Sequence, residues 1–122
     1  MKLIAINDDV ISFLSNEESL ISGKISNISI QHKPSGLCIG LNIILMYSKE
    51  NKKIFLEFES IKEYAFFYTS DRYFYNIERY TFFKDGNLFY ISFDPANEQE
   101  TSRDENDNDF ILAGRMSLYK NF

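Results

Sequence analysis

Apolar and polar residues alternate with a period of two along most of the chain. The alternation is clearest in residues 37–47, whose apolar members are Leu37, Ile39, Leu41, Ile43, Leu45 and Tyr47. Because successive side chains of a strand point to opposite faces, this segment predicts a strand with one apolar face. Its other face, with Cys38 and Asn42, is mixed, so we expect that face to be partly covered as well.

Other segments show the same period and are separated by turn residues. We predict further strands at residues 2–6, 21–30, 54–59, 61–69, 73–83, 88–93 and 110–119. In the second of these strands the apolar positions change face near Ser26 or Asn27, which indicates a β-bulge. Pro34 suits the second position of a turn, and Asp85-Gly86 between two apolar runs is a strong hairpin signal.

One segment near the N-terminus has the period of a helix instead. Val10, Ile11 and Leu14 would lie on one face of a helix, and Asn7 is a suitable N-cap residue. The two aspartates directly after this cap are favourable at the positive end of the helix dipole. We therefore predict one short helix at residues 8–15.

These elements predict a mainly β fold in a single domain that spans residues 1–122. Seven to eight short strands, with turn residues about every ten positions, are typical of an antiparallel sandwich, a barrel or a strongly curved meander. The pattern leaves these three architectures open. The aromatic content also favours a sheet, because the 12 Phe and 8 Tyr suit a pleated, half-buried surface.

The composition narrows the cellular setting. Cys38 is the only cysteine, so an internal disulfide is impossible and a cysteine-based metal site is not expected. No apolar stretch reaches the length of about 18 residues that a membrane span needs. The N-terminus turns acidic at Asp8 and lacks the cleavage pattern of a signal peptide. We expect a cytoplasmic protein without a membrane segment or a cofactor, and its oligomeric state stays open.

The negative charge is concentrated in one segment. The chain has 13 Lys and Arg against 18 Asp and Glu, a formal net charge of −5. Residues 94–109 hold seven of these acids and one base, which is −6, so the rest of the chain carries +1. Without a basic patch to neutralise phosphates, nucleic acid is not expected as a direct partner. The high charge of residues 95–109 predicts a mobile loop with little role in folding.

Few residues suggest catalysis. We interpret His32 as a solvated turn residue and Cys38 as a small buried side chain, rather than as a base and its nucleophile. Glu57 and Glu59 share a strand face and could form a metal or acid–base pair, but an exposed polar face explains them more simply. Residues 104–109 resemble the start of a calcium loop but lack its glycine, and the final glutamate is missing further on, so an EF-hand is excluded. We predict no catalytic or metal-binding residues.

Aromatic residues are concentrated in the middle of the chain. Residues 66–68 and 73–75 place rings on both faces of their predicted strands. One face must belong to the core. The other face is either covered or forms an exposed, tyrosine-rich patch of the kind that anchors protein interfaces. Tyr73 and Tyr75 are the candidate anchors.

The second half of the chain carries a resemblance to a known group of proteins. An aromatic hairpin at residues 75–95 is followed by the acidic segment and by residues 109–111, with the sequences YNIERYTFFKDGNLFYISFDP and DFI. This order resembles small bacterial immunity proteins, which are encoded beside polymorphic or contact-dependent-inhibition toxins. The resemblance implies a cytoplasmic protein that binds a toxin domain, often a nuclease, and blocks its active site.

The charge pattern agrees with this implication. Nuclease toxins have basic clefts for phosphate, and an acidic loop in such a cleft would mimic nucleic acid and be steered there by complementary fields. We predict an immunity protein, not an enzyme, whose partner is a basic toxin domain. The predicted partner-binding residues are Asp94, Glu98, Glu100, Asp104, Glu105, Asp107, Asp109, Tyr73 and Tyr75. The alternatives are a small metal-dependent hydrolase that uses Glu57 and Glu59, and a small-ligand-binding β domain with exposed tyrosines.

Overall fold

The regular structure consists mainly of strands. The computed structural model describes residues 1–17, 19–48, 52–71, 75–97 and 101–120. In chain order the elements are β1 (Lys2–Ile6), α1 (Asp8–Ser12), the π-helical turn η1 (Phe13–Glu17), β2 (Lys24–Lys33), β3 (Gly36–Ile44), β4 (Lys53–Ala65), β5 (Thr81–Asp85), β6 (Leu88–Asp94) and β7 (Asn108–Lys120). The prediction of a mainly β fold with one short N-terminal helical segment is confirmed.

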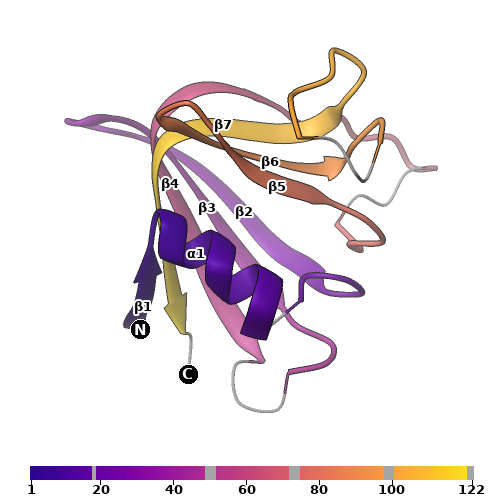
Figure 1. The fold of residues 1–122 in the computed structure, drawn as a ribbon, viewed down its shortest axis with the longest axis horizontal. Helices are drawn as coiled ribbons and strands as arrows, with labels where there is room; N and C mark the ends of the chain where they lie inside the picture. The colour runs from indigo at the N-terminus through magenta and orange to yellow at the C-terminus, as the bar shows by residue number, and fades with distance from the viewer. Residues whose placement is uncertain (18, 49–51, 72–74, 98–100, 121–122) are drawn as a thin grey trace.

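The strands pair antiparallel in one sheet. Their order is β2-β3-β4-β7-β6-β5, and β1 also pairs with β7. On the side opposite β4, β7 pairs with two strands in succession: its first residues pair with β6, and its last residues pair with β1. The sheet is curved and does not close into a barrel (Figure 1). Of the three predicted architectures, the strongly curved meander is the nearest, although β7 lies between β4 and β6, so the strands do not follow one another in simple sequence order.

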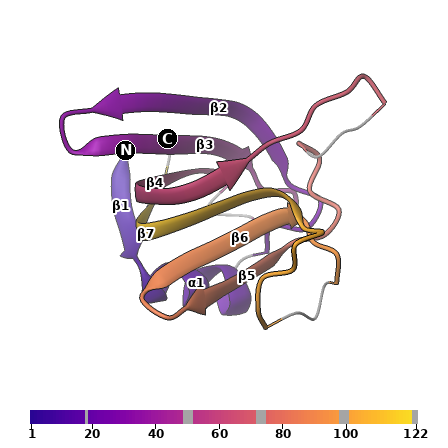
Figure 2. The same ribbon diagram turned by 90° about the horizontal axis from the view of Figure 1, so that it is seen from above.

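The main core lies on the concave face of the sheet, where α1 packs (Figure 2). Val10 and Leu14 of the helical segment are at most 1% exposed. On the apolar face predicted for residues 37–47, Leu41, Ile43 and Leu45 are also at most 1% exposed, and so are Leu56 and Phe58 of β4. Burial of one such side chain stabilises the fold by about 1.5–3 kcal/mol. The alternation in β3 and β4 thus identified the face that drives folding.

The bulge and the second hairpin occur where the sequence predicted them. The register of β2 against β3 shifts between Ile25 and Asn27. In the hairpin between β5 and β6, Asp85 pairs with Leu88, so the turn itself has only two residues. Gly86 is the first of them and has a φ of +62°, a conformation that favours glycine.

The strand predicted at residues 54–59 and the first part of the strand predicted at residues 61–69 form the single strand β4, which ends at Ala65. Ser60 lies between them with a φ of +54°, and the register against β7 shifts shortly after it, between Ile61 and Glu63. The strand bends at this point without ending. The polar Ser60 therefore marks a bend and not a turn.

Of the described residues in the strand predicted at residues 73–83, only those from Thr81 onward belong to a strand, β5. Before it, the Ile25 N–H donates a hydrogen bond to the Tyr75 carbonyl at 2.7 Å. The Ile77 N–H in turn donates to the Gly23 carbonyl at 2.8 Å, and the Ile77 side chain is fully buried. A short contact with the start of β2 therefore replaces the continuous strand.

Candidate functional site

The described part of the acidic segment is folded onto the sheet, and Asp107 holds it there. This side chain is only 5% exposed. Its Oδ2 accepts hydrogen bonds from the Tyr90 hydroxyl at 2.7 Å and from the Asp104 N–H at 3.1 Å, and its Oδ1 accepts the Ala96 N–H at 2.8 Å. The prediction of a mobile segment with little role in folding did not anticipate these contacts, because the buried Tyr90 hydroxyl satisfies this carboxylate together with two backbone donors of the segment.

Arg103 is the second anchor of the segment. Its guanidinium carbon lies 5.3 Å from the ring centroids of both Tyr90 and Phe110. Its Nη2 atom lies 2.6 Å from the Oε2 atom of Glu63 on β4. Burial lowers the pKa of Arg103, but the hydrogen bond and charge of Glu63 outweigh this effect and raise the pKa overall. A single cation thus joins the acidic segment to three strands, β4, β6 and β7.

Beneath these anchors, a small apolar layer lies on the outer face of the sheet. Tyr90 and Leu112 pair across β6 and β7 and are 1% and 5% exposed. Because side chains alternate along a strand, Tyr90 points away from Phe89 and Ile91, which belong to the main core. The acidic segment therefore covers apolar surface and contributes to the fold.

Two further acids of the segment make internal contacts. Asp109 is 1% exposed with a φ of +51°, and its Oδ1 accepts the Phe67 N–H at 2.8 Å. This bond joins the start of β7 to the residues after β4. Asp94 is half-buried and lies 3.4 Å from Nη2 of Arg79. Its second oxygen accepts a hydrogen bond from the Asn108 amide at 3.3 Å.

Burial divides the acids that were predicted to contact a partner. Asp104 and Glu105 are exposed, Asp94 is half-buried, and Asp107 and Asp109 are buried. The predicted residues that lie outside the described part of the chain are Glu98, Glu100 and Tyr73. A docking protein can reach the first two acids directly, whereas the two buried acids shape the segment from within.

An aromatic ridge at residues 66–68 extends beyond the end of β4. Phe67 is 55% exposed and Tyr68 is 70% exposed, whereas Phe66 packs against the main core. Sequence reasoning placed rings on both faces here but did not choose these two side chains as anchors. Which ring is exposed depends on tertiary packing, which the local pattern does not contain.

A groove separates the aromatic ridge from β2. Its volume is about 350 Å³, and its lining consists of Ile25, Ser26, Asn27, Ile28, Phe66, Tyr68 and Tyr75. Tyr75, one of the predicted anchors, is half-buried in this wall. The rings and isoleucines of the lining are suited to an apolar side chain of a partner.

The aromatic ridge and the exposed acids lie at the same end of the molecule. In both Figure 1 and Figure 2, the chain after β4 and the acidic segment lie toward the end away from the two termini, although Figure 2 shows that they project in different directions. The hydrogen bond from Phe67 to Asp109 fixes this arrangement. We call this region the acidic–aromatic end, and its accessible members are Phe67, Tyr68, Tyr75, Asp104 and Glu105.

Glu57 and Glu59, the residues of the hydrolase alternative, each face a cation on the outer face of the sheet. Lys33 Nζ lies 3.6 Å from Glu57 Oε2, and Arg115 Nε lies 3.8 Å from Glu59 Oε1. Among the described residues, no group of three or more His, Cys, Asp or Glu side chains is placed to hold a metal ion. The surroundings of both glutamates are those of an ion-paired polar face.

Cys38 and His32 lie nearby on β3 and β2. Cys38 is 6% exposed, and its burial raises the pKa of the thiol; the negative charge of Glu57 raises it further. The thiol therefore stays protonated and unreactive at neutral pH. His32 is exposed and pairs with Leu37 in the β2–β3 ladder.

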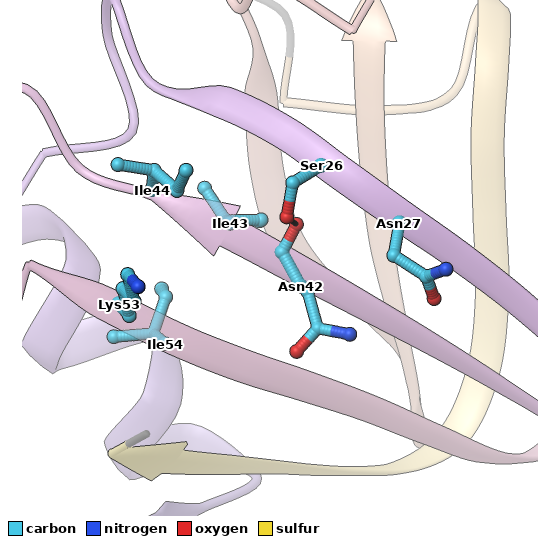
Figure 3. Close-up of a pocket in the computed structure, with 7 residues that line it drawn as sticks. All are labelled: Ser26, Asn27, Asn42, Ile43, Ile44, Lys53 and Ile54. Carbon is cyan, nitrogen blue, oxygen red and sulfur yellow. Dashed lines mark hydrogen bonds between the residues drawn. The ribbon is translucent and has the colours of Figure 1, made fainter. Parts of the chain in front are cut away.

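A second depression lies at the bulge of β2, where this strand meets β3 and β4 (Figure 3). It measures about 320 Å³ and is lined by Ser26, Asn27, Asn42, Ile43, Ile44, Lys53 and Ile54. The Ser26 hydroxyl donates a hydrogen bond to the Asn42 carbonyl at 3.3 Å. The lining contains side-chain donors but no carboxylate, histidine or thiol, so it holds no acid–base pair.

None of the helices in the described parts of the chain is long and apolar enough to cross a membrane. In comparisons with known proteins, no family model matches this chain, and no curated protein or solved structure matches it significantly. The acidic–aromatic end itself is therefore the feature of this chain that points to a function.

Proposed function

We propose that this chain is an immunity protein, which binds a basic toxin domain through its acidic–aromatic end and blocks the toxin's active site. The observation that carries the proposal is the presence of exposed carboxylates and exposed rings at the same end of the molecule. Asp104 and Glu105 are exposed on a segment that packs against the sheet, and Phe67 and Tyr68 are exposed after β4, where the Phe67 N–H donates a hydrogen bond to Asp109 at the start of β7. Exposed aromatic side chains of this size are typical anchors of protein interfaces.

The carboxylates and the aromatic side chains would affect different steps of binding. Carboxylates at the rim attract a basic cleft and raise the association rate, an effect that salt screens. Tyr68, with its wall of apolar groove residues, would be desolvated in the complex and would slow dissociation. Fast association and slow dissociation both help an inhibitor to neutralise its toxin before the toxin acts.

The surroundings of other candidate residues favour binding over hydrolysis. Glu57 and Glu59 are each paired with a cation, and the Cys38 thiol is held in its protonated form. A barrel that encloses a cavity would favour the ligand-binding alternative, whereas the sheet of this chain is open. The acidic–aromatic end, in contrast, combines exposed carboxylates with exposed aromatic rings.

The test is co-expression with the toxin domain encoded by the neighbouring reading frame in the source genome. The proposal predicts that the wild-type chain restores growth and co-purifies with that domain. Tyr68→Ala combined with Phe67→Ala should lose both effects. The control is Met46→Ala with Tyr47→Ala, which removes side chains that are 61% and 74% exposed away from this end. The proposal would be refuted if the wild-type chain neither restored growth nor formed a complex with the toxin domain.

A further inference from the structure

The acidic segment carries internal anchors that face the sheet and not a partner. Asp107 accepts three hydrogen bonds while 5% exposed, and the Arg103 guanidinium lies over the rings of Tyr90 and Phe110. Neither side chain is needed to cover the main core, which lies on the opposite face. A segment that served only as a solvated connection would not require this network.

The anchors lie directly beside the exposed acids in the sequence. Arg103 precedes Asp104, and Asp107 follows Glu105 by two residues. The Asp107 carboxylate accepts the N–H of Asp104, and the Asp107 N–H donates to the Asp104 carbonyl at 3.0 Å. The backbone that carries the two exposed acids is therefore closed into a turn by Asp107.

We propose that Arg103 and Asp107 are positioning residues, which hold Asp104 and Glu105 in their binding arrangement before the partner arrives. The inference depends on the proposed function above. Ordering a flexible segment during binding costs affinity, and a segment that is already ordered avoids this cost. Arg103 is the more informative of the two, because it fastens the turn to β4 through Glu63 at 2.6 Å.

The experiment combines amide hydrogen exchange of the free protein with binding to the toxin domain recovered in the co-expression test. Arg103→Gln keeps a hydrogen-bonding side chain but removes the charge that Glu63 and the two rings contact. It should speed exchange at the N–H groups of Ala96 and Asp104 at least about tenfold, as expected for local opening. Amides of Leu56 and Leu118 in the core should exchange as in the wild type.

The same variant should raise the Kd for the toxin domain about threefold to tenfold, the range expected when a few side chains must be ordered on binding. Arg103→Lys should restore part of both effects, because it can pair with Glu63. The matched control is Arg115→Gln, which breaks the ion pair with Glu59 on the outer face of the same sheet. This control should change neither the exchange near Asp104 nor the Kd.

Two results would overturn the inference. One is exchange at Ala96 and Asp104 in the wild type as fast as in an unfolded peptide. The other is faster exchange in Arg103→Gln with an unchanged Kd. Failure of the wild-type chain to bind the toxin domain would instead refute the proposed function, while the exchange data would still decide whether Arg103 holds the segment.

Discussion

The contribution of the acidic segment to stability can be measured at Tyr90. Tyr90→Phe removes only the hydroxyl that donates to Asp107 at 2.7 Å. The ring itself remains, with its neighbours Phe83 and Phe110 at centroid distances of 5.1 and 5.7 Å. A buried hydrogen bond to a charged group contributes about 1.5–3 kcal/mol to stability. We expect a loss of this size in the free energy of unfolding.

The assay is urea unfolding at pH 7, followed by far-ultraviolet circular dichroism. The midpoint should fall while the m value stays constant, because the exposed surface is unchanged. At about 4 °C per kcal/mol for a domain of this size, the Tm should fall by about 6–12 °C. Tyr68→Phe removes a hydroxyl from a ring that is 70% exposed and serves as the control. A cost below about 0.5 kcal/mol for Tyr90→Phe would show that the segment is a solvated loop after all.

Two further outcomes test the core and the buried thiol. Ile43→Ala should lower the free energy of unfolding in urea by about 2–5 kcal/mol. Ile44→Ala, at a site on the other face that is 39% exposed, should lower it much less. Equal losses would contradict the assigned faces. The Cys38 thiol should react with Ellman's reagent only slowly at pH 8, because its pKa is raised above the ordinary value of 9.0. The folded state disfavours the thiolate, so the contribution of the neutral thiol to the free energy of unfolding should be complete below about pH 9 and should decline as the pH rises through the raised pKa. Fast labelling of the folded protein at pH 8 would contradict the raised pKa.

The sheet could be predicted because its signal is local. In β3 and β4, alternation identifies the buried face from neighbouring residues alone, and Leu41 and Phe58 are buried as expected. The same reasoning found the bulge in β2. It could not choose among sandwich, barrel and curved sheet, because β7 joins strands from both halves of the chain.

The contacts of the acidic segment could not be predicted because its partners are distant in sequence. Its composition suggested a solvated loop, yet Asp107 is buried by a contact with Tyr90 on another strand. Arg103 was missed as well, although it is the single base among the seven acids of residues 94–109. An isolated base in an acidic run was the available signal, but its partner Glu63 lies 40 positions earlier, beyond any local pattern.

The central claim is that the acidic–aromatic end receives a basic partner, and the most direct measurement is the association rate constant by stopped flow. The charge variant is Asp104→Asn with Glu105→Gln, and the matched control is Asp9→Asn with Asp85→Asn, which removes the same charge from exposed sites elsewhere. At low salt, the charge variant should associate with the toxin domain several-fold more slowly than the control, and about 0.5 M salt should abolish the difference. Equal association rate constants for the two variants at low salt would contradict the claim.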